Sequence, residues 1–161
     1  MTVLLHVQLK FQIRAEPDAA WAALHSPAVL AALYGPIIAL EPLDSHETGL
    51  NAAVRLRLFG RITLGTQLIG AYDEVREHDG RPVRILRDSG IPLTGPMSVL
   101  DVWDHRMAVS ALPGGGTLWR DRLVFGGPIT TLPSLLALWP ALWATWQWRG
   151  WRIRRLARRW S

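Results

Sequence analysis

The sequence predicts an α+β fold with seven antiparallel strands, two short helices after the first strand, and one long C-terminal helix. Three observations support this prediction. Apolar and polar residues alternate from the N-terminus, as in a half-buried strand. Runs of similar alternation are then separated by short Gly- and Pro-rich turns, which favour antiparallel hairpins. Near the C-terminus, apolar residues recur at spacings of three and four, as on one face of a helix. The 161 residues suit one domain with its own core, spanning 1–161.

The first strand and the two short helices are expected between residues 3 and 33. Residues 3–14 place Val and Leu on one face and mostly polar side chains on the other. Glu16-Pro17-Asp18 begins a helix, because proline suits the first turn and acids suit the positive end of the helix dipole. Ser26-Pro27 ends that helix and begins a second one over 28–33.

Six further strands are expected between residues 36 and 126. Turn residues separate them, including a turn at His46–Leu50 and the Pro113–Gly116 turn. The predicted strands are 36–43, 51–59, 61–77, 82–88, 97–112 and 117–126.

The C-terminal helix is expected over about 132–160, with a basic tail at 149–161. Residues 123–148 carry no charge, so a membrane span is an alternative. Three prolines interrupt that stretch, however. One apolar stripe also continues through the arginine-rich half, as expected for a helix packed on a sheet. The stripe consists of Leu135, Trp139, Leu142, Trp146, Gly150, Ile153, Ala157 and Trp160.

The positive net charge of +5 resides in the tail. Residues 1–148 carry twelve basic and thirteen acidic side chains, whereas residues 149–161 carry six arginines and no acid. With no basic surface elsewhere and no recognised module, specific nucleic-acid binding is not expected. Trp148 and Trp151 fall opposite the stripe among Arg149–Arg159, which suits peripheral membrane contact. The alternative is that these tryptophans cover the end of the sheet or form a homodimer contact.

The most specific motif lies between residues 103 and 125. Trp103-Asp104-His105-Arg106-Met107 is followed by Gly115-Gly116-Thr117, Asp121 and Phe125. Together with the order of elements, this resembles the START-related helix-grip superfamily, which includes polyketide cyclases and lipid-transfer domains. The resemblance implies a curved sheet wrapped around the C-terminal helix, with a ligand cavity between them. Met107 stands where the cyclase-like members have a second histidine.

The predicted cavity is mainly apolar with a few polar groups, as is usual for a small-molecule site. Tyr72, His105 and Asp121 are the polar candidates for orienting a ligand. The remaining candidate ligand-binding residues are Met97, Trp103, Met107, Trp119, Leu135, Trp139, Leu142, Trp143 and Trp146.

A catalytic pair of His105 and Asp121 is not expected from the predicted hairpin. The Pro113–Gly116 turn places Asp121 beside Val109, so that His105 and Asp121 lie roughly 13 Å apart. No metal-ligand spacing or cofactor motif is present. The expected function is binding of an apolar or aromatic small molecule, such as a lipid or polyketide-like compound. A cyclase-like or aromatase-like enzyme, a membrane-surface or partner-binding module, and a packed core without ligand are the alternatives. The absence of a basic leader favours a cytoplasmic location.

Overall fold

The structure, a computed structural model, describes residues 1–44 and 51–160, and the turn predicted at His46–Leu50 lies outside them. The chain begins with β1 (Thr2–Ile13), α1 (Pro17–Leu24) and α2 (Pro27–Tyr34). The sheet continues through β2 (Ile38–Pro42), β3 (Asn51–Leu58), β4 (Ile62–His78), β5 (Arg81–Asp88) and β6 (Ile91–Pro92). A 3-10 turn, η1 (Pro96–Val99), precedes β7 (Val102–Ala111) and β8 (Thr117–Pro128). The chain ends with η2 (Ile129–Thr131), α3 (Leu132–Leu156) and η3 (Ala157–Arg159).

The strands form one antiparallel sheet in the order β1-β8-β7-β5-β4-β3-β2, and β6 pairs with β4. The predicted fold class is therefore confirmed, with the short β6 as an additional strand. The strand predicted over 97–112 begins only at Val102. Gly95 has a φ of 84° and Pro96 follows it, so the chain turns into η1 instead of extending.

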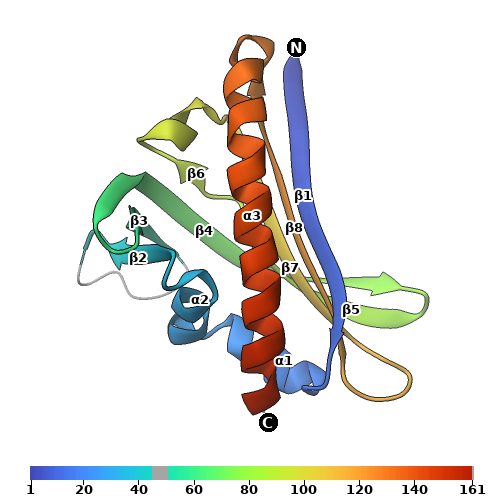
Figure 1. Ribbon diagram of the computed structural model, residues 1–161. Helices are drawn as coiled ribbons and strands as arrows, with labels where there is room; N and C mark the ends of the chain where they lie inside the picture. The colour runs from blue at the N-terminus through green and yellow to red at the C-terminus, as the bar shows by residue number, and fades with distance from the viewer. Residues whose placement is uncertain (45–50, 161) are drawn as a thin grey trace.

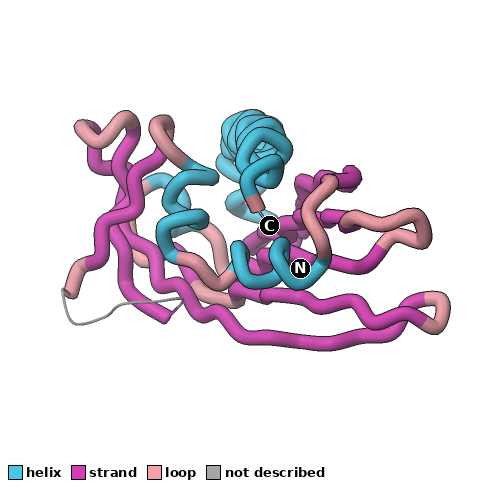
Figure 2. The backbone as a smooth tube through the Cα atoms, turned by 90° about the horizontal axis from the view of Figure 1, so that it is seen from below, coloured by secondary structure: helices cyan, strands magenta, loops and turns pink. Residues whose placement is uncertain are grey.

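All three helices lie on the concave side of the sheet (Figures 1 and 2). The long α3 crosses this side and packs mainly on β1, α2 and β8. The predicted stripe explains that contact, because Leu135, Leu142, Trp146 and Ile153 are buried. The N-cap of α2 is Ser26, whose hydroxyl accepts a hydrogen bond from the Val29 amide at 3.3 Å.

Close backbone packing holds η1 against β4. A side chain at Gly65 would collide with the Thr94 carbonyl, and one at Gly95 would collide with the Leu64 carbonyl. Both glycines have positive φ values, which other residues rarely adopt. The Thr66 amide donates to Thr94 Oγ1 at 2.9 Å. These contacts fix the backbone position of η1, which carries Met97.

Among the residues that the structure describes, three apolar clusters lie on the concave side. The C-terminal core surrounds the second half of α3 and includes Phe11, Leu24, Leu33, Leu86, Met107, Val109, Trp119 and Ile153. The N-terminal core surrounds the first half of α3 and includes Val7, Leu100, Trp103, Leu123, Phe125, Leu135, Leu142 and Trp146. The β3 cluster comprises Ala52, Val54 and Leu56, with Ile38, Leu40, Leu64, Ile69 and Met97 packed against them.

Candidate functional site

A buried polar cluster of His105, Asp121 and Arg149 lies between the N-terminal and C-terminal cores. Strand alternation places His105 between Trp103 and Met107 on the inner face of β7. Asp121 occupies the inner face of β8 between Trp119 and Leu123 in the same way. Arg149 of α3 is 0% exposed and His105 is 3% exposed. The cluster therefore joins β7, β8 and α3 at the centre of the molecule.

Asp121 accepts hydrogen bonds from three side chains. His105 Nε2 lies 2.8 Å from Asp121 Oδ1, and Trp146 Nε1 donates to the same oxygen at 3.0 Å. Arg149 donates to Asp121 Oδ2 through Nη2 at 2.8 Å and through Nε at 3.2 Å. Charge-assisted bonds of this kind are stronger than neutral ones. They compensate for burying a carboxylate away from water.

The charges in this cluster stabilise one another. Burial alone would raise the pKa of Asp121, but Arg149 and His105 hold that pKa well below its usual range. Burial alone would lower the pKa of Arg149, whereas the Asp121 carboxylate raises it above its ordinary value. Arg149 and Asp121 thus form an ion pair inside the protein.

Tyr34 of α2 covers the Arg149 guanidinium. The Arg149 Cζ atom lies 4.4 Å from the centre of the Tyr34 ring, within the range of a cation–π contact. Burial raises the pKa of the Tyr34 hydroxyl. Arg149 Nη2 also lies 3.2 Å from Met107 Sδ. Nη1 has no hydrogen-bond partner within residues 1–44 and 51–160.

This arrangement is better suited to holding α3 on the sheet than to catalysis at an open site. Asp121 is fully buried and already accepts four hydrogen bonds. His105 is directed at Asp121 and packs edge-on against Trp146, with ring centres 5.1 Å apart. Neither group is presented to a substrate, so the cluster's clear role is to fix α3 on the sheet.

The expectation that His105 and Asp121 lie about 13 Å apart is wrong. Ala111 pairs with Thr117, so the β7–β8 loop spans 112–116 and Met107 lies opposite Asp121. His105 lies opposite Leu123 and is a diagonal neighbour of Asp121. Diagonal pairs on one sheet face are within reach of long side chains. A two-residue difference in register thus creates the contact.

Three predicted cavity residues lie elsewhere. Tyr72 is 43% exposed on the convex face of the sheet, where Arg87 lies 5.8 Å from its ring centre. Trp139 donates to the His6 carbonyl at 3.1 Å and stacks on Trp143, with both tryptophans partly exposed beside β1. None of the three lines the space between the sheet and α3.

The other predicted ligand residues lie on the concave side, mostly inside the cores. Met97 is partly buried and contacts both the N-terminal core and the β3 cluster. The buried residues pack against one another, and their contact with a ligand remains a prediction. They are Trp103, His105, Met107, Trp119, Asp121, Leu135, Leu142 and Trp146.

Arg149 and Tyr34 were not predicted as parts of this site. The sequence places Arg149 in the basic tail, but the structure buries its side chain completely. Its position follows Trp146 by three residues and precedes Ile153 by four, which places it on the buried side of the helix. That spacing is the signal by which Arg149 is recognisable. Tyr34 ends a short helix and carries no comparable signal.

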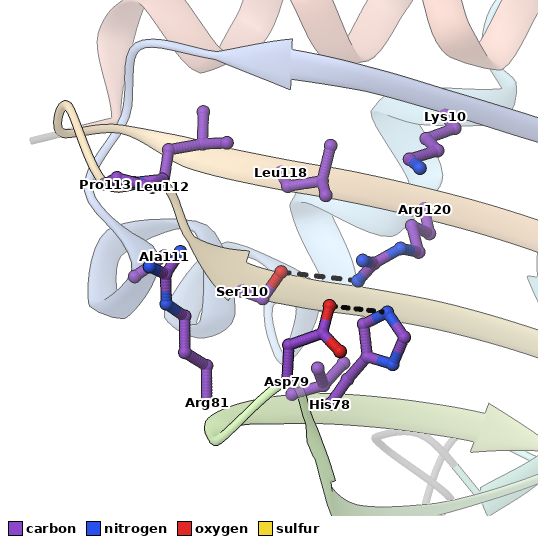
Figure 3. A pocket seen from close by; sticks show the side chains of 11 residues that line it. Lys10, His78, Asp79, Arg81, Ser110, Ala111, Leu112, Pro113, Leu118 and Arg120 are labelled. Atoms are coloured by element: carbon purple, nitrogen blue, oxygen red, sulfur yellow. Dashed lines mark hydrogen bonds and ion pairs between the residues drawn. The ribbon is translucent and has the colours of Figure 1, made fainter.

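Two hollows occur where the β4–β5 and β7–β8 hairpins separate. One, on the convex face, has a volume of about 250 Å³ and is lined by Lys10, Arg81, Ser110 and Arg120, among others. Figure 3 shows Arg120 directed toward Ser110, whose hydroxyl accepts its hydrogen bond at 3.3 Å. The second has a volume of about 270 Å³ beside Pro17 and Val109. Neither hollow lies between α3 and the polar cluster.

The described residues contain no group of three or more His, Asp or Glu side chains that could hold a metal ion. Within the same residues, no helix has both the length and the apolar character needed to cross a membrane.

Comparisons with known proteins identify the fold. No family model and no curated protein sequence matches the chain. Among solved structures, norcoclaurine synthase from Thalictrum flavum, in complex with dopamine and hydroxybenzaldehyde, is similar with a TM-score of 0.62 and 10% identity. That match covers 100% of this chain and 89% of the synthase chain. The Zhui aromatase/cyclase from Streptomyces sp. R1128 has a TM-score of 0.52 and 15% identity, covering 96% of both chains.

A third similar structure is protein CV1439 from Chromobacterium violaceum. Its TM-score is 0.54 and its identity 15%, with 94% of this chain and 96% of that chain covered. The fold is shared in all three matches: an antiparallel sheet wrapped around a long C-terminal helix, the helix-grip arrangement that the sequence predicts. The chain has that fold, as its sequence motif indicated.

Proposed function

We propose that this protein binds a hydrophobic or aromatic small molecule on the concave side of its sheet. The binding region lies between the inner face of β2–β4 and the N-terminal half of α3. The observation that carries this proposal is the apolar inner face of β3, whose buried side chains form a cluster distinct from the two cores around α3. Met97 packs against both the β3 cluster and the N-terminal core. The region therefore combines the apolar side chains of the β3 cluster with the flexible, polarizable side chain of Met97.

The chemistry of this region favours an apolar ligand. Ala52, Val54 and Leu56 present small and medium-sized apolar side chains on the inner face of β3. Gln67 of β4 lies opposite Val54 and is also buried, so its amide supplies a polar group for orienting a ligand. Burying roughly 200 Å² of apolar ligand surface contributes about 5 kcal/mol before the cost of association.

The similar structures support a ligand of this class. Norcoclaurine synthase was solved in complex with dopamine and hydroxybenzaldehyde, both aromatic compounds, and another similar protein is an aromatase/cyclase. The closed His105–Asp121–Arg149 cluster offers no acid or base to such a ligand. Binding is therefore better supported than a cyclase reaction that uses those residues.

The test is a comparison of ligand binding by Met97→Trp and Tyr72→Trp variants. A naphthalene-based fluorescent probe reports binding, and native mass spectrometry of the purified protein detects ligands carried from the expression host. We expect Met97→Trp to weaken probe binding at least tenfold, because the larger ring occupies ligand space between the β3 cluster and the N-terminal core. Tyr72→Trp, on the opposite sheet face, should bind like the wild type.

The proposal is rejected if wild-type protein binds neither the probe nor a copurified compound. It is also rejected if Met97→Trp binds as tightly as the wild type, since the ligand would then lie elsewhere. A thermal melt of each variant verifies that the substituted proteins are folded.

A further inference from the structure

We propose that the outer face of α3 binds the surface of an anionic lipid bilayer. This α3 outer face consists of the solvent-exposed side chains on α3 and η3. It combines exposed aromatic residues with arginines and contains no acidic residue. The inference is independent of the ligand site, which lies on the inner side of the helix.

The first half of the α3 outer face is apolar. Leu136, Trp139 and Trp143 are exposed there, with Trp143 at 47%. The indoles of Trp139 and Trp143 stack with ring centres 6.5 Å apart. Trp151, 45% exposed, lies two turns beyond Trp143 on the same side. Large aromatic side chains that remain half exposed on one helix mark an interaction surface.

The second half of the α3 outer face is basic. Arg155, Arg158 and Arg159 are exposed there, whereas Arg154 lies over the Phe11 ring of β1 with its Cζ atom 4.0 Å from the ring centre. Leu136, Trp143, Gln147, Trp151, Arg155 and Arg158 follow one another at spacings of three, four or seven residues, which places them along one side of the helix. The Arg155 guanidinium lies 5.3 Å from the Trp151 ring centre. No Asp or Glu occurs between residues 132 and 160.

The structure changes which residues belong to this surface. Trp148 and Arg149, predicted to contact a membrane, both point inward. Trp148 Nε1 donates to the Gly35 carbonyl of α2 at 3.2 Å, and Arg149 is fully buried. Arg152 Nε donates to the Ala32 carbonyl at 2.9 Å. The surface is therefore made by Trp139, Trp143 and Trp151 with the later arginines.

A lipid headgroup layer matches this combination of side chains. Indoles prefer the boundary between headgroups and acyl chains, and guanidinium groups bind lipid phosphates. Basic residues attract a protein to anionic membranes, and this attraction weakens as salt screens the charges. A nucleic acid would use the arginines without requiring an exposed leucine and several tryptophans beside them.

Vesicle flotation with the full-length protein tests the proposal. Vesicles of phosphatidylcholine alone are compared with vesicles containing about 30% phosphatidylserine. We expect wild-type protein to float with the anionic vesicles in low salt, and much less with neutral vesicles or in 0.5 M salt. Replacing Arg155 and Arg158 by Gln should lower the partition coefficient roughly thirtyfold, since each basic residue near such a surface contributes about 1 kcal/mol. Trp143→Ala with Trp151→Ala should cause a loss of at least tenfold.

A control with Arg76→Gln and Arg122→Gln removes two charges from exposed positions on the convex sheet face. It should retain nearly full vesicle binding. Equal losses in the control and the Arg155/Arg158 variant would overturn the proposal, because binding would then reflect net charge. Failure of wild-type protein to bind anionic vesicles would also overturn it. Sedimentation that shows a dimer abolished by the two tryptophan substitutions would reassign the face to protein–protein contact.

Discussion

At the scale of single residues, Asp121 shows how charge can be placed inside an otherwise apolar interior. The carboxylate lies between two tryptophan-containing cores and is stabilised by donors from β7 and α3. Removing one member of such a buried pair leaves the other without compensation and costs about 3–5 kcal/mol. The cluster is therefore a sensitive point of the fold even without a catalytic role.

Asp121→Asn should lower the free energy of unfolding by about 3–5 kcal/mol near pH 7, because it leaves the Arg149 cation unpaired. The folded-state pKa of Asp121 lies below the ordinary value of about 3.9. Its stabilising effect is thus complete above that ordinary value and is lost as the pH falls toward the folded-state pKa. The difference between variant and wild type should be constant from pH 7 to 5 and shrink below pH 4.

Urea unfolding at pH 7, 5 and 3 measures this difference. Asp18→Asn is the control, because the Asp18 side chain is 94% exposed although it pairs with Arg84. It should change stability by no more than about 1 kcal/mol. A difference between Asp121→Asn and wild type that stayed the same down to pH 3 would contradict the buried ion pair.

At the scale of elements, α3 completes hydrogen bonding at the end of α2. The last carbonyl groups of a helix lack partners within that helix. Here Trp148 Nε1 donates to the Gly35 carbonyl and Arg152 Nε donates to the Ala32 carbonyl. Trp148, which lies opposite the apolar stripe, therefore has a structural partner in α2. The two contacts also hold Tyr34 over Arg149.

Trp148→Phe should loosen α2 while leaving the sheet intact. The substitution removes the hydrogen bond to Gly35 but keeps an aromatic ring, so the expected loss is about 1 kcal/mol. Hydrogen exchange should become faster in Leu30–Gly35 and remain unchanged in β7 and β8. Trp143→Phe, at an exposed position of α3 where the ring stacks on Trp139, is the matched control. Equal exchange rates in α2 for both variants would show that the Gly35 contact is unimportant.

Alternation along the sequence predicted the inner faces of β1, β7 and β8 but failed in β4. There, Leu64 packs against the β3 cluster whereas Leu68 is exposed on the other face. The β3–β4 register shifts next to Gly65, and such a bulge changes the face to which later residues point. Tyr72 was assigned to the wrong face for this reason. The alternation of apolar and polar residues along a strand does not reveal where a bulge occurs.

The β7–β8 hairpin shows a second limit of sequence reasoning. The Gly-rich turn located the hairpin correctly, but its composition is compatible with loops that differ in length. The actual loop pairs Ala111 with Thr117 and brings His105 to Asp121. Contacts that join three elements, such as Arg149 with Asp121, depend on this register and on the rotation of α3. The element order alone does not determine either.

At the scale of the whole molecule, the arginine-rich end of the chain both contributes buried side chains to the core and carries exposed charges. Residues 149–161 carry six arginines, but the inner side of this segment belongs to the core. Ile153 and Ala157 are buried in the C-terminal core, and the Trp160 ring lies 5.8 Å from the Trp119 ring. The charged segment is therefore an integral part of the domain, with its inner side in the core and its outer side in solvent.

Truncation after Trp148 should consequently abolish cooperative folding. It removes the Arg149 partner of Asp121, at a cost of about 3–5 kcal/mol, and also removes Ile153 from the core, for about 2–5 kcal/mol more. Those losses approach the total stability of about 5–15 kcal/mol that is usual for a domain. The paired substitution Arg158→Gln and Arg159→Gln retains every buried side chain and should melt like the wild type. Circular dichroism melts compare the three proteins. A cooperative transition in the truncated chain near the wild-type temperature would show that the outer charges can be removed as a unit, and that the buried Arg149 is dispensable.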